Sequence, residues 1–90
     1  MALLQMRWEK KVVWKLMPGT PVGRALVAAT QRLEEAGSET ASLDAQVILA
    51  HILGKERGWL FAHYDQALTE EEAEQFADMV ARRAAAEPVA

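Results

Sequence analysis

The sequence predicts an all-α fold, a small helical bundle of four to five helices. Apolar residues recur at the three- and four-residue spacing of helices over most of the chain. Gly and Pro separate these stretches where helices begin and end, and no stretch offers a partner for a strand. The length of 90 residues provides one small domain with a modest core.

The first well-defined helix is expected to follow Pro18 and Gly19. Thr20 is predicted as its N-cap and Pro21 as its first helical residue, where the missing N–H costs nothing. Gly37 is expected to end it in a left-handed conformation. Its apolar face is predicted to contain Leu26, Ala29 and Leu33.

A second helix is predicted from Ser42, as N-cap, to Gly54, with Asp44 in its first turn. A strand is the alternative prediction for Val47–Leu49, but capping residues at both ends and a run of about 11 residues favour a helix. Apolar residues lie on nearly every side, so we expect a central helix surrounded by the others. These residues are Leu43, Ala45, Val47, Ile48, Leu49, Ala50, Ile52 and Leu53.

Residues 57–64 form a short apolar piece, predicted as one or two helical turns that supply aromatic mass to the core. Thr69 and Glu72 have the spacing of a capping box and predict the start of the last helix. Pro88 marks its end or the start of a further turn. The buried stripe of this helix is predicted to contain Ala73, Phe76, Ala77, Val80 and Ala84.

Residues 1–19 are predicted to be an N-terminal extension or arm, and residues 20–90 the helical domain. The extension alternates like a strand at its start, yet Leu4, Trp8, Val12 and Leu16 also fit one helix face; the lack of a partner strand favours helix. It has four basic residues against one acidic, net +3, whereas residues 20–90 have six against twelve, net −6. Trp8 and Trp14 fit the core better than a patch for a partner.

Composition excludes several classes of protein. A hydrophobic content of 51% and a charged content of 26% are typical of a folded chain. The absence of cysteine excludes disulfides and thiolate metal sites. No apolar run approaches the roughly 20 residues of a membrane span, and the N-terminus lacks a secretory signal, so the expected compartment is the cytoplasm. The acidic body argues against direct nucleic-acid binding.

No residue is predicted to be catalytic, to bind a cofactor or to bind a metal. His51 and His63 are twelve apart, not four as in zinc hydrolase helices, and each is interpreted as packed or hydrogen-bonded. Capping explains the carboxylates at 70–74. The glycines are scattered as caps and turns rather than gathered in a phosphate-binding loop. The residues alone therefore indicate a domain that binds a partner.

Residues 42–55 read SLDAQVILAHILGK. This segment resembles the LDA-x-x-LLAH-x-LG segment of the HemK/PrmC family, the release factor glutamine methyltransferases, and three further segments resemble the same family. Residues 59–63 (WLFAH) resemble its short aromatic helix, 68–72 (LTEEE) its L-T/S-x-E capping segment, and 82–90 (RRAAAEPVA) its RR-x-x-x-EP end. Each segment alone is weak, but four in the right order over residues 22–90 are fairly specific.

The resemblance implies two domains with different roles. Family members have a helical N-terminal domain followed by a Rossmann-like domain that binds S-adenosylmethionine and methylates the Gly-Gly-Gln glutamine of class 1 peptide chain release factors. The catalytic Asn-Pro-Pro-Tyr and glycine-rich motifs match no position here, so no cofactor is expected in this chain, and S-adenosylmethionine is expected for the full enzyme. The chain ends near the expected connection to that catalytic domain, its partner in cis. Residues 1–19 depart from the family pattern.

The resemblance thus implies a domain that helps bind and position the release factor without being catalytic alone. Within the segments quoted above, the apolar pattern of the residues predicts that five of them lie in the core: Leu43, Val47, Leu49, Ile52 and Trp59. Arg82 and Arg83, an exposed basic pair in an acidic domain, are the predicted partner-binding residues.

The alternative is a free-standing helical protein–protein interaction module, with self-association through the two N-terminal tryptophans. Sedimentation with and without residues 1–19 tests that alternative. The coding sequence beyond residue 90 tests the interpretation as the N-terminal domain of a methyltransferase.

Overall fold

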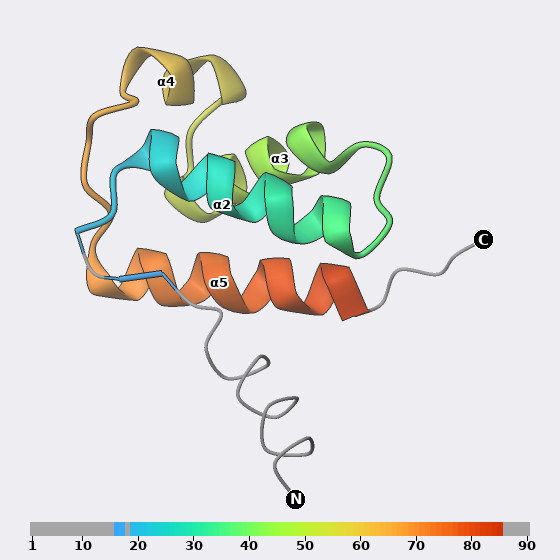
Figure 1. The fold of residues 1–90 in the computed structure, drawn as a ribbon. Coiled ribbons are helices and arrows are strands. Elements are labelled where there is room, and N and C mark those ends of the chain that lie inside the picture. The colour runs from blue at the N-terminus through green and yellow to red at the C-terminus, as the bar shows by residue number, and fades with distance from the viewer. Residues whose placement is uncertain (1–15, 18, 86–90) are drawn as a thin grey trace, which may run out of the picture.

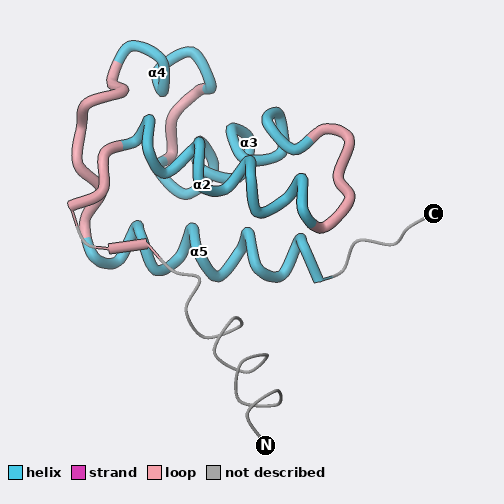
Figure 2. Tube along the Cα trace, viewed as in Figure 1, coloured by secondary structure: helices cyan, strands magenta, loops and turns pink. Residues whose placement is uncertain are grey.

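A computed structural model describes residues 16–17 and 19–85, which form four helices and no strand (Figures 1 and 2). This confirms the predicted all-α bundle. The predictions for residues 1–15, including both tryptophans, and for Pro88 lie outside the described residues, and the division at residue 19 stays a prediction. The helices are α2 (Val22–Glu35), α3 (Ala41–Leu53), α4 (Arg57–Ala62) and α5 (Glu70–Ala85).

Three long helices enclose the core, and α4 lies across one end of α2 and α3 (Figure 1). The largest side chains that are fully buried are Phe76, Leu33, Leu49, Leu60, Val22 and Val80. They come from all four helices, so each helix contributes apolar area that is removed from water. Among the described residues no polar or charged side chain is buried.

The start of α2 is capped by a distant loop rather than by a side chain. Pro21 occupies the N-cap position and the helix begins at Val22. The Val22 N–H donates to the Gln66 carbonyl at 2.9 Å, and the Gly23 N–H donates to the Tyr64 carbonyl at 3.0 Å. These carbonyls satisfy amides that lack a partner within the helix. Thr20 donates its hydroxyl to Met17 instead, so the prediction of Thr20 as N-cap and Pro21 as first helical residue was wrong.

The same two segments continue to pair before α2. Leu68 donates its N–H to the Thr20 carbonyl at 2.9 Å, and Gly19 donates to the Leu68 carbonyl at 3.1 Å. Leu16 packs against the core just before this contact. The chain that leads into α2 is therefore fixed to the chain that leads into α5.

Glycines end α2 and α3 as predicted. Gly37 has φ +99° and Gly54 has φ +68°, both in the left-handed region that glycine adopts without strain. At each end the following residue donates its N–H to a carbonyl five residues earlier, at 3.0 Å. This is the Schellman arrangement, which satisfies the last carbonyls of a helix.

The outer side of α3 is open to solvent. Leu49 is fully buried, but Leu43 is 43% exposed and Val47 is 50% exposed. The predictions that α3 is surrounded on every side, and that Leu43 and Val47 lie in the core, were therefore wrong. The other helices cover only part of its circumference, because a short bundle has too few elements to enclose one of its own helices. Ile52 and Trp59 are partly buried against the core.

The start of α3 also differs from the prediction. The helix begins at Ala41 with Thr40 as N-cap, so Ser42 lies inside the helix rather than at its cap.

The N-terminal cap and the buried face of α5 agree with those predicted from the sequence. The Thr69 hydroxyl accepts from the Glu72 N–H at 3.1 Å, and a Glu72 carboxylate oxygen accepts from the Thr69 N–H at 2.9 Å. This confirms the capping box. The predicted stripe is buried at Ala73, Phe76, Ala77 and Val80 and partly buried at Ala84.

Candidate partner-binding groove

A groove of about 290 Å³ lies where α2, α3 and the α4 end of the bundle meet. Its apolar members, Val27, Phe61 and Tyr64, are exposed by 53%, 54% and 44%, whereas Leu26 is 5% exposed. The polar residues that line it are Thr30, Gln31, Ser42 and Gln46. Exposed apolar side chains gathered in one hollow, with uncharged polar groups beside them, are typical of a binding surface.

The geometry of α4 brings Phe61 to the surface. Trp59, Leu60 and Phe61 are consecutive, and at about 100° per residue they span about 200° of the helix. The buried side chain is Leu60, while Trp59 is partly buried and Phe61 faces out. The prediction that this piece supplies aromatic mass to the core was therefore wrong for Phe61 and for Tyr64, which are 54% and 44% exposed.

Phe61 and Tyr64 form one aromatic wall. Their ring centroids are 6.2 Å apart and their planes differ by 19°. Offset stacking of this kind stabilises aromatic pairs beyond the area that they bury. A partner would therefore meet two preformed rings.

Gly23 fixes the position of Tyr64. The Tyr64 carbonyl accepts from the Gly23 N–H, and the Tyr64 ring lies so close to Gly23 that a Cβ at this position would overlap it. Gly23 is buried within α2. Its interpretation as part of a cap or turn was therefore wrong, because close approach of the ring explains the glycine.

One polar wall of the groove is built within α3. The Gln46 side chain donates to the Ser42 hydroxyl at 3.1 Å. This contact holds both side chains along one side of the helix, since residues four apart lie on the same face. Hydroxyl and amide groups in this wall can donate to or accept from a partner's backbone.

The two histidines differ in their surroundings. The His63 ring stacks on Trp59 with centroids 4.0 Å apart, and its Nδ1 lies 2.9 Å from the Trp59 carbonyl. Lys55 Nζ lies 5.4 Å from the Trp59 ring centroid. His63 is thus packed and hydrogen-bonded as predicted, whereas His51 is exposed on α3, which contradicts its interpretation as a packed residue.

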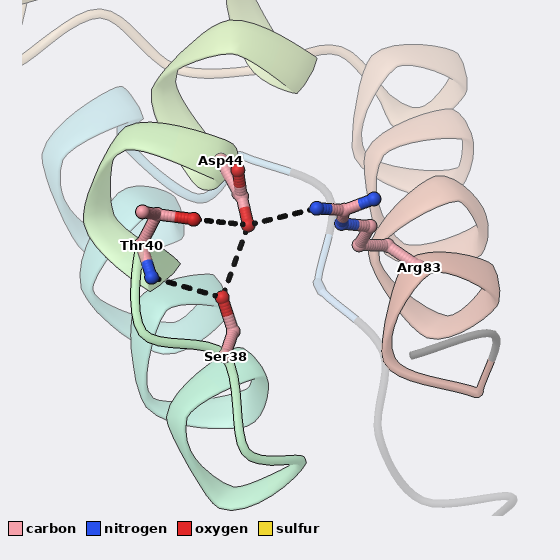
Figure 3. Close-up of polar contacts among 4 residues, drawn as sticks. All are labelled: Ser38, Thr40, Asp44 and Arg83. Atoms are coloured by element: carbon pink, nitrogen blue, oxygen red, sulfur yellow. Dashed lines mark hydrogen bonds and ion pairs between the residues drawn. The ribbon is translucent and has the colours of Figure 1, made fainter. Parts of the chain in front are cut away.

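Both predicted partner-binding arginines form ion pairs. Arg82 Nε lies 3.2 Å from Asp78 of the same helix, with both side chains well exposed. Arg83 lies 3.4 Å from Asp44 of α3 (Figure 3). Neither arginine lines the groove. Their role in partner binding stays a prediction.

Asp44 Oδ2 joins three side chains. It accepts from Ser38 Oγ at 3.0 Å, from Thr40 Oγ1 at 3.1 Å and from Arg83 (Figure 3). Asp44 therefore organises the loop before α3 as well as facing α5. Its place in the first turn, expected from the helix dipole, is confirmed.

Within residues 16–17 and 19–85, no group of three or more His, Cys, Asp or Glu side chains could hold a metal ion. The described part of the chain also has no glycine-rich loop between a strand and a helix that would fit S-adenosylmethionine. No described helix is both long and apolar enough to cross a membrane.

Fold and groove together define a small all-α domain with a mostly uncharged groove among α2, α3 and the α4 end of the bundle. The sequence pattern of the PrmC N-terminal domain family matches residues 24–90, and the chain belongs to this family. The match includes every residue that lines the groove.

Relatives bear the name release factor glutamine methyltransferase. The chain is 41% identical to the Vibrio cholerae protein over 66 residues, 73% of this chain and 23% of that protein. It is 38% identical to the Rhodopirellula baltica protein over 69 residues (77% and 23%) and 44% identical to the Shewanella oneidensis protein over 55 residues (61% and 19%). The chain therefore spans less than a quarter of the length of these relatives. No solved structure matches it.

Proposed function

We propose that this chain is the N-terminal helical domain of an S-adenosylmethionine-dependent release factor glutamine methyltransferase, and that its groove binds and positions a class 1 peptide chain release factor in the cytoplasm. The exposed Phe61 carries the proposal. It belongs to a segment that resembles the family, and it stands in the groove rather than in the core.

The groove has the make-up of a protein-binding surface. Aromatic side chains dominate the binding energy of many protein interfaces, because they remove a large apolar area from water. Phe61 and Tyr64 form such a pair, and Val27 extends it onto α2. The uncharged amide and hydroxyl groups beside them would satisfy polar groups of the partner that become buried.

A binding role of this kind assists catalysis from a distance. Contacts made away from the reacting atoms contribute free energy that holds the target in the productive position. Methyl transfer itself is not assigned to the described residues. The reaction is assigned to a catalytic domain in cis, as the resemblance implies.

Calorimetric titration of the chain with a class 1 release factor tests the proposal. We expect binding by the parent chain and a loss of about tenfold or more in affinity for Phe61→Ala, which corresponds to about 1.4 kcal/mol. The control is Met79→Ala, a second exposed apolar residue that lies outside the groove. Equal affinities for Phe61→Ala and the parent would contradict the role of the groove, and no heat at high micromolar concentration would contradict binding itself.

A further inference from the structure

A second hollow lies between α3 and α5, away from the groove. It has a volume of about 320 Å³ and is lined by His51, Ile52, Gln75, Asp78 and Met79. Met79 is 36% exposed. The groove lies among α2, α3 and the α4 end of the bundle and shares none of these residues, so the two surfaces are separate.

The apolar outer side of α3 extends this hollow. Leu43, Val47 and His51 follow one another at intervals of four residues, so they lie along one side of the helix. Leu43 and Val47 are about half exposed. An apolar strip therefore leads from the outer side of α3 into a hollow that contains a carboxylate.

We propose that residues 4–15 of the same chain bind in this hollow. Their apolar residues at intervals of four are Leu4, Trp8 and Val12, and their basic residues at the same interval are Arg7, Lys11 and Lys15. A segment with this pattern, bound as a helix, presents apolar and basic stripes side by side. The apolar stripe would contact Met79 and Val47, and the basic stripe would face the exposed carboxylates of α5, Glu71, Glu74 and Asp78.

The attachment point brings the segment within reach. Leu16 packs on the core and the Gly19 N–H donates to the Leu68 carbonyl, so the described chain before α2 begins close to the start of α5. Met79 lies nine residues after Glu70 in α5, which is about 14 Å along the axis at 1.5 Å per residue. Twelve residues span about 18 Å as a helix and more when extended. The tether also raises the local concentration of the segment at this surface.

Charge favours the same placement. Glu71, Glu74 and Asp78 are exposed on α5, where Asp78 pairs with Arg82 at 3.2 Å. The N-terminal extension has a net charge of +3. Attraction between the two signs orients the segment along α5, while the apolar contacts in the hollow determine where it binds.

A spin label tests the placement directly. The chain contains no cysteine, so Gln5→Cys provides one site for a nitroxide outside both stripes. We expect the backbone amide NMR signals of Ile52, Gln75 and Met79 to lose more than half of their intensity relative to the reduced label. Those of Val27 and Gln31 should keep theirs. Unchanged signals at the hollow, or losses at the groove instead, would overturn the proposal.

A mixed sample identifies the occupant. Spin-labelled chain without nitrogen-15 is added to nitrogen-15 chain without the label. Binding within one chain predicts no loss of intensity in this mixture. A loss as large as in the labelled chain would mean that a second copy occupies the hollow, which would overturn the proposal.

A substitution in the hollow completes the test. Met79→Lys places a positive charge where the basic segment should bind, and we expect at least a twofold recovery of the lost intensity. The matched control is Val27→Lys, the same kind of change at an exposed residue of the groove, which should leave the loss unchanged. Equal behaviour of the two variants would contradict binding at Met79.

Discussion

Arg83 donates to Asp44 Oδ2 across 3.4 Å and thereby joins residues 39 positions apart in the sequence. The two residues belong to two of the segments that resemble the family, the LDA segment of α3 and the double arginine of α5. Their contact gives both segments a structural explanation, because it ties the first turn of α3 to the last turns of α5.

Asp44 should stabilise the fold mainly through its hydrogen bonds to Ser38 and Thr40 in the loop before α3. Asp44→Ala removes three hydrogen bonds, and we expect a loss of about 1–2 kcal/mol in the free energy of unfolding. Arg83→Ala removes one contact of a side chain that is 53% exposed, so about 0.5 kcal/mol is expected. Urea denaturation followed by circular dichroism measures both. A larger loss for Arg83→Ala than for Asp44→Ala would contradict this order.

Two threonines that both look like N-caps should behave differently. Thr69→Ala breaks a reciprocal capping box and should lower the free energy of unfolding by about 1 kcal/mol. Thr20→Ala should cost less, about 0.5 kcal/mol, because the α2 amides are satisfied by Tyr64 and Gln66 and not by Thr20. Thermal unfolding of the two variants compares them. Equal losses would mean that Thr20 caps α2 after all.

Replacing either of two helix glycines, Gly23 and Gly58, with alanine should change the free energy of unfolding in opposite directions. Gly23→Ala gains helix propensity, yet its Cβ would overlap the Tyr64 ring, so we expect a net loss of about 1–3 kcal/mol. Gly58→Ala meets open space in α4 and should stabilise by about 0.5 kcal/mol. Denaturant titration measures the change in the free energy of unfolding for both variants. A stabilised Gly23→Ala would show that Tyr64 moves away without cost.

The two sides of α3 should differ in their sensitivity to truncation. Leu49→Ala leaves a cavity in the core and should cost about 2–5 kcal/mol. Val47→Ala removes atoms from a side chain that is half exposed and should change stability by about 0.5 kcal/mol or less. The midpoints of urea unfolding compare them. A Val47→Ala loss close to that of Leu49→Ala would place both sides of α3 in the core.

Local signals predicted much of this fold. The capping box at Thr69 and the helix ends at Gly37 and Gly54 depend on neighbouring residues alone, and the structure confirms them. The α2 cap could not be predicted in this way, because its acceptors come from a loop more than 40 residues further along the chain. Leu43 and Val47 were assigned to the core because α3 is apolar on most sides, and only the packing of the other helices decides which side stays open.

The groove was harder to predict than the helices. Its residues come from three places in the sequence, and none of them was a predicted site residue. One signal was present at Phe61, because three consecutive apolar residues in a short helix cannot all face inward. The arginines drew attention through their charge, yet Arg82 and Arg83 both form ion pairs.

Mapping the release factor onto the nitrogen-15-labelled chain by NMR tests whether the groove among α2, α3 and the α4 end of the bundle is the binding surface. We expect the largest changes in chemical shift on adding a class 1 release factor at Val27, Gln31, Gln46 and Phe61, with small changes around Arg82. The largest changes around Arg82 and Arg83, with the groove signals unmoved, would contradict this expectation.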